Sequence, residues 1–84
     1  SEPAVTQVLI GRVGEVISTS GAYVRGVNHM PWRVRFKIAD SENVMMADIS
    51  YKKNGTPSAI EVKTQNSSSP EFAREIALLI SDRI

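Results

Sequence analysis

The chain has 84 residues, no cysteine, and ten basic against nine acidic residues, for a formal charge of +1. This length predicts a single domain over residues 1–84. The absence of cysteine excludes a disulfide framework and a thiolate metal site. The near-neutral charge does not single out a nucleic-acid or membrane binder, so any charged surface has to be local. No apolar run approaches the ~18 residues of a membrane span, and no signal-peptide pattern is present, so we expect a cytoplasmic protein.

Residues 2–19 are the most ambiguous segment. Apolar side chains recur at helical spacing at Val5, Val8, Leu9, Val13, Val16 and Ile17. Pro3 suits a first helical turn, and Ser18-Thr19-Ser20-Gly21 suits a stop. Gly11 and Gly14 argue against a helix, because each costs about 1 kcal/mol relative to alanine. A helix is favoured because the segment is long for one strand, and a strand remains the alternative.

The next two segments alternate between apolar and polar residues, as a half-buried strand does. The pattern of residues 22–28 predicts an edge strand, and that of residues 28–31 predicts a loop that reverses the chain. Residues 31–39 predict the strongest strand, begun by Pro31 because proline donates no ladder hydrogen bond. Its inward side chains are Trp32, Val34, Phe36 and Ile38, and its basic ones, Arg33, Arg35 and Lys37, point outward.

Residues 44–53 predict the following strand, with Met45, Ala47, Ile49 and Tyr51 inward. Asp40-Ser41-Glu42-Asn43 is a turn by composition, and it aligns residue 38 with 45 and 34 with 49. Asn54-Gly55 is a strong signal for a tight hairpin, which aligns residue 49 with 60 and 47 with 62. Both turns therefore place the aliphatic side chains on one inner face.

The C-terminal segment predicts a helix opened by Ser69 as cap, Pro70 in the first position and Glu71 in the first turn. Its apolar stripe is Phe72, Ile76, Leu79 and Ile80, whereas Leu78 and Ile84 lie off the stripe. The predicted fold is α+β: an antiparallel meander of three or four strands, with the C-terminal helix and the N-terminal helix on one face.

The order of helix, three strands and helix resembles the topology of double-stranded-RNA-binding domains. That family's basic start to its last helix is missing, because Ser67-Ser68-Ser69-Pro70-Glu71 stands there instead. The function of that family is therefore not carried over.

The predicted register sets the outward side chains in rows. Arg35 faces Asp48, which faces Glu61, and a charge ladder of this kind stabilises a sheet by roughly 0.2–1 kcal/mol per pair. Lys37 faces Met46, which faces Lys63, and Tyr23 and Arg25 are expected beside Arg33 or Arg35. The outward Met46 is either a scattered surface residue or a partner contact near Val27. The candidate binding residues are Tyr23, Arg25, Arg33, Arg35, Lys37, Met46 and Lys63.

The sequence offers little support for catalysis. His29, in a predicted loop, is a general-base candidate only in a minor hypothesis of a small hydrolase, because no second group stands at a fixed spacing. Asp40 and Glu42 lack the spacing of a calcium loop. We therefore expect a protein that is not an enzyme and holds no cofactor or metal.

The favoured hypothesis is a module for protein–protein interaction or self-association. It uses the spare apolar residues Val27, Met46, Leu78 and Ile84. The alternative is a nucleic-acid-binding domain that uses the basic outer face through Arg25, Arg33, Lys37 and Lys63, with phosphate contacts and a stacking aromatic such as Tyr23.

Overall fold

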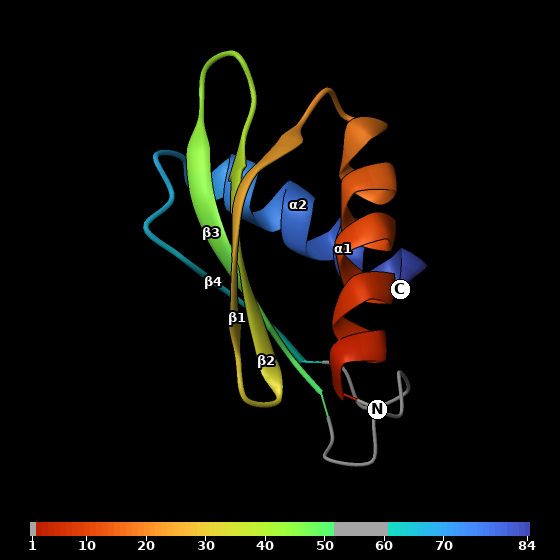
Figure 1. The fold of residues 1–84 in the computed structure, drawn as a ribbon. Coiled ribbons are helices and arrows are strands. Elements are labelled where there is room, and N and C mark those ends of the chain that lie inside the picture. Colours follow the sequence, from red (N-terminus) through yellow and green to blue (C-terminus); the bar gives the residue numbers. More distant parts are fainter. Residues whose placement is uncertain (1, 52–60) are drawn as a thin grey trace.

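The computed structural model describes residues 2–51 and 61–84. The elements in chain order are α1 (Glu2–Ser18), β1 (Tyr23–Met30), β2 (Arg33–Ala39), β3 (Val44–Ser50), β4 (Glu61–Gln65) and α2 (Pro70–Arg83). The four strands of the described ranges form one antiparallel sheet in the order β1-β2-β3-β4, so each strand pairs with its neighbour in the chain (Figure 1). The predicted α+β meander with a helix at each end is confirmed.

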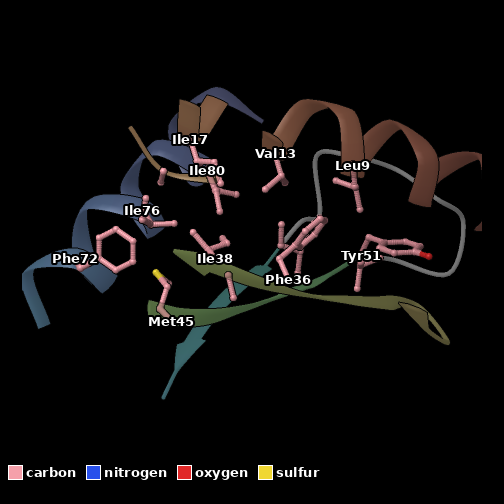
Figure 2. Packing of buried hydrophobic residues seen from close by; sticks show 14 residues of the cluster. Leu9, Val13, Ile17, Phe36, Ile38, Met45, Tyr51, Phe72, Ile76 and Ile80 are labelled. Carbon is pink, nitrogen blue, oxygen red and sulfur yellow. The ribbon is translucent and has the colours of Figure 1, made fainter. Parts of the chain in front are cut away.

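Both helices pack on the same face of the sheet. α1 contacts β1 and α2, and α2 contacts β3 and β4. Figure 2 shows the side chains between the helix layer and the sheet. The core that they form includes Leu9, Val13, Ile17, Phe36, Ile38, Met45, Tyr51, Phe72, Ile76 and Ile80. Neither helix covers the opposite face of the sheet. Within the described ranges, neither α1 nor α2 has the length and apolar composition of a membrane-spanning helix.

α1 is the helix that the spacing of the apolar residues favoured, but one residue of its predicted buried face is exposed. Leu9, Val13, Val16 and Ile17 are buried as predicted, but Val8 is 58% exposed. The buried polar residue Thr6 lies on this face instead, with its hydroxyl oxygen 3.4 Å from that of Tyr51. Position 8 lies about 100° around the helix from position 9, and that angle carries it off the core side. The side chain of Val5 lies outside the described ones.

The turn between β1 and β2 differs from the predicted loop at residues 28–31. β1 continues to Met30, which pairs with Arg33, so Pro31 and Trp32 alone make the turn. Trp32 has a positive φ of 59°. Proline followed by a residue with positive φ is the pattern of a type II turn. Trp32 is therefore not a strand residue, although its ring packs edge-on against Tyr51, with 5.8 Å between centroids.

The register of β2 and β3 is the predicted one. Ile38 pairs with Met45 and Val34 with Ile49. The register of β3 and β4 was predicted wrongly, because Ile49 pairs with Val62. The prediction assumed a two-residue turn at Asn54-Gly55, which lies outside the described residues. The slip is two residues, so every side chain keeps its predicted face.

α2 begins as predicted. The Ser69 hydroxyl accepts a hydrogen bond from the backbone N–H of Phe72 at 3.2 Å, and Pro70 follows as the first helical residue. Phe72, Ile76 and Ile80 are buried. Off this stripe, Leu78 is 56% exposed, whereas Ile84 packs against the core.

The Ser69 cap gives a test of the helix boundary. Ser69→Ala removes the acceptor for the Phe72 N–H, so we expect the free energy of unfolding to fall by about 1 kcal/mol in urea denaturation. Ser69→Thr keeps the hydroxyl and serves as the control, with a much smaller loss. Equal losses in the two variants would show that the cap does not stabilise α2.

Candidate functional site

The candidate site is the helix-free side of the sheet, which we call the outer face. Residues that alternate with the buried Val34, Phe36 and Ile38 point to this side, and they are Arg33, Arg35 and Lys37 on β2. The paired positions add Gly26, Asn28 and Met30 from β1, Met46, Asp48 and Ser50 from β3, and Glu61, Lys63 and Gln65 from β4. The outer face therefore holds six of the seven binding residues that the sequence predicts: Tyr23, which pairs with Ala39 at the end of β2, and Arg33, Arg35, Lys37, Met46 and Lys63.

A β-bulge in β1 changes the predicted alternation of this strand. The register shifts between Val24 and Gly26, so Arg25 is the extra residue and lies next to Lys37 instead of Arg33 or Arg35. Val24 pairs with Ile38 and Val27 with Phe36, both of which face inward. Val27 therefore pairs on the helix side of the sheet, although it lines one hollow together with Met46, near which it was predicted.

Asp48 is the most buried polar residue of the outer face. Arg35 donates to it from Nε to Oδ1 at 2.7 Å and from Nη2 to Oδ2 at 2.9 Å. Gln65 donates to the same Oδ2 from Nε2 at 3.2 Å. Asp48 is only 7% exposed because these long side chains cover it. The predicted pairing of Arg35 with Asp48 on the outer face is confirmed.

This cluster fixes the charge and orientation of Arg35. The hydrogen bonds from Arg35 hold the pKa of Asp48 below its usual range, against the opposing effect of burial, so the carboxylate stays ionised. A bidentate pair also restrains the guanidinium plane. Two of its N–H groups bind Asp48, and the others are available to a ligand.

The observed register changes which residue of β4 belongs to the predicted charge ladder. Lys63, not Glu61, pairs with Asp48, and Gln65 pairs with Met46. The Lys63 amine is 3.7 Å from the carboxylate of Glu61 on its own strand, and both side chains are well exposed. Such an exposed pair contributes little to stability. The row across the sheet is therefore Arg35, Asp48 and Lys63.

Arg33 and Lys37 carry the charge of the outer face that is not neutralised. In the described part of the chain, the ion pairs on this face are Arg35 with Asp48 and Lys63 with Glu61, so neither Arg33 nor Lys37 has a carboxylate there. Arg33 instead donates from Nη2 to the sulfur of Met30 at 3.3 Å. Met46 lies half-buried between Lys37 and Gln65.

Other candidates from the sequence lie away from this cluster. Tyr23 is 54% exposed and opens β1 opposite Ala39. His29 is an exposed strand residue opposite Val34, not a loop residue. Asp40 accepts the backbone N–H groups of Glu42 and Asn43 at 2.8 and 2.7 Å, which lowers the pKa of its carboxyl and confirms its role in the turn. Among the described residues, no group of three His, Cys, Asp or Glu side chains could hold a metal.

The sequence analysis missed the role of Gln65 and the bulge at Arg25. Gln65 reaches Asp48 only in the shifted register of β4, which no local signal specifies. The bulge had a signal, because a glycine inside a strand pattern often marks one, and Gly26 follows Arg25 directly.

The Asp48 cluster predicts a pH-dependent stability. Because the folded-state pKa of Asp48 is lowered, its stabilising effect is present above the unfolded pKa of about 4 and is lost as the pH falls through the folded value. We expect Asp48→Asn to lower the free energy of unfolding by about 2 kcal/mol at neutral pH, since a partly exposed pair contributes less than a fully buried one.

The measurement is urea denaturation of wild type and Asp48→Asn across the acid range. Their difference should shrink as the pH falls. Glu61→Gln, at the exposed pair, is the control and should change stability little at any pH. A difference between wild type and Asp48→Asn that stays constant from neutral to acid pH would contradict the assigned role of the carboxylate.

Comparisons with known proteins place this fold in a family. A family model described as the TATA-binding-like protein domain of the TOTE conflict systems matches residues 4–80. The match extends from α1 through the sheet into α2. Comparisons with curated proteins and with solved structures found no match. The family match covers nearly the whole chain, so the chain belongs to the TATA-binding-like domains of the TOTE conflict systems, as a small α+β binding module.

Proposed function

We propose that this domain binds double-stranded DNA through the outer face of its sheet, without catalysis. The observation that carries the proposal is the row of Arg33, Arg35 and Lys37 on one strand of a face that neither helix covers. The family description, TATA-binding-like, adds support because TATA names a DNA sequence.

The row suits a phosphate backbone. Alternate residues of a strand lie about 6.6 Å apart, so three cations follow one line across the face. Contacts of lysine and arginine with phosphates supply most of the sequence-independent affinity for DNA. Arg33 and Lys37 supply net charge, whereas Arg35 supplies oriented N–H donors because Asp48 already neutralises it. This arrangement combines electrostatic attraction with one fixed hydrogen-bonding group.

The remaining side chains favour a duplex over a single strand. Binding of single strands relies on aromatic side chains that stack on bases. Within the described ranges, Trp32 and Tyr51 pack with the core, so Tyr23, opposite Ala39 on the edge strand, is the one aromatic side chain that the outer face offers. The outer face offers Asn28 and Gln65 amides and the thioethers of Met30 and Met46. Amides and arginines are the groups that read a minor groove, where apolar side chains also insert.

The hypothesis of a protein partner has less support from the geometry. Its four spare apolar residues are spread over the molecule: Val27 on the helix side of β1, Met46 on the outer face, Leu78 on the exposed side of α2 and Ile84 against the core. These four residues do not lie together in one continuous apolar patch.

Fluorescence anisotropy with a labelled short duplex tests the proposal. We expect the duplex to bind more tightly than its single strand, with log affinity falling linearly with log salt. Arg33→Glu should weaken binding at least about tenfold, because it replaces a phosphate contact by a repulsion. The matched control is Arg74→Glu on α2, an exposed charge reversal in the helix layer that should leave affinity nearly unchanged.

Duplexes rich in A·T and in G·C should both be titrated, since a minor-groove reader separates them. The proposal fails if wild type does not bind a duplex at low salt. It also fails if Arg33→Glu and Arg74→Glu weaken binding equally, because the outer face would then not be the surface used.

A further inference from the structure

We infer that Arg25, Lys37 and Asn66 form a binding site for one phosphate group, at the end of the outer face where β1 bulges. These residues line one hollow of about 230 Å³ together with Val44, Met45 and Met46. The inference rests on the proposed function where the phosphate belongs to DNA, and it stands separately for a free phosphate.

The β-bulge brings the two cations together. Arg25 is the extra residue in β1, and the next residue, Gly26, pairs with Lys37. A bulge re-aims the side chain that it carries. Gly26 also leaves its backbone bare under the lysine, since a Cβ built there would lie 3.6 Å from Cδ of Lys37. This distance is an ordinary van der Waals contact, so the aliphatic part of Lys37 lies over Gly26, next to the bulge residue Arg25.

The residues that line the hollow give it a positive charge, which favours the binding of an anion. Two cations and three apolar residues line it, and no acidic residue does so among the described ones. Like charges on adjacent strands destabilise a sheet unless something compensates them. Asp40, in the turn between β2 and β3, uses its carboxylate for the backbone N–H groups of Glu42 and Asn43. A bound anion would offset the two positive charges.

Asn66 completes the donor set. It directly follows β4 and has a positive φ of 53°. Asparagine tolerates this conformation better than most residues, although it still carries some strain, which is common at functional positions. Its amide adds neutral N–H donors to the two cations. A phosphate has more acceptor oxygens than a carboxylate has. Charged and neutral donors around one hollow therefore match a phosphate better than a carboxylate.

The hollow continues toward the centre of the outer face. A second hollow, lined by Gly26, Asn28, Arg35, Lys37 and Met46 among others, shares Lys37 and Met46 with the first. Lys37 thus stands between the phosphate site and the oriented guanidinium of Arg35. A DNA strand held at the phosphate site would continue over Arg35.

The salt dependence of duplex binding tests whether Arg25 and Lys37 hold the same phosphate. Arg25→Gln, Lys37→Gln and the double variant are titrated with a labelled duplex at several salt concentrations. Loss of one phosphate contact reduces the slope of log affinity against log salt by about 0.9. We expect the double variant to lose about 0.9 in total, because one phosphate is lost. Arg74→Gln, which removes an exposed charge on α2 away from the outer face, is the control and should change the slope little.

Titration with inorganic phosphate tests the site without DNA. In ¹H–¹⁵N NMR spectra at constant ionic strength, phosphate should shift the signals of Arg25, Lys37 and Asn66 saturably, whereas chloride should not. Asn66→Asp keeps the shape and the tolerance of positive φ but adds a negative charge, so it should abolish these shifts in a folded protein.

The outcomes separate this inference from the proposed function. If the duplex binds but the double variant keeps the wild-type slope, or loses about 1.8 as for two separate phosphates, the shared site is overturned and DNA binding stands. If the duplex does not bind while phosphate shifts these residues, the site stands for a free phosphate group and the proposed function fails. If neither binds, both are overturned.

Discussion

The pairing of β2 with β3 is the constraint on which the rest of this structure depends. It sets Phe36 opposite Ala47 beneath the helices and Arg35 opposite Asp48 on the other side. The same ladder therefore builds the core and orients the candidate binding groups. A shift of one residue would bury the charges and expose the core, so the helix layer holds this register in place. Packing of the core on the helix side of the sheet therefore also determines which side chains lie together on the outer face.

Among the described residues of the outer face, one basic side chain of β2 is paired with a carboxylate and two others are not. Asp48 removes the net charge of Arg35 but holds its guanidinium in one orientation, with support from Gln65. Arg33 and Lys37 keep their charge because the described outer face gives them no carboxylate. A protein with a near-neutral overall charge can therefore present a local basic surface.

How much the sequence could predict depended on whether local patterns or distant contacts decided each feature. Alternation predicted β2, β3, their register and the pairing of Arg35 with Asp48, because burial of one face leaves a single solution. The cap at Ser69 was equally local. The register of β4 depended on a turn whose length the sequence does not settle, and the faces of Arg25 and Val27 depended on one inserted residue. Gln65 could not be assigned to Asp48 until that register was known.

The proposed binding of DNA to the outer face can be followed at three methionines. Met45 and Met46 are neighbours on β3, one buried under the helices and one half-buried on the outer face, and Met30 lies at the end of β1 beside Arg33. With ¹³C-methyl-labelled methionine, addition of duplex DNA should shift the methyl signals of Met46 and Met30 more than that of Met45, which also lines the phosphate hollow but is only 2% exposed. A saturating duplex that shifts Met45 alone, or none of the three, would contradict the account.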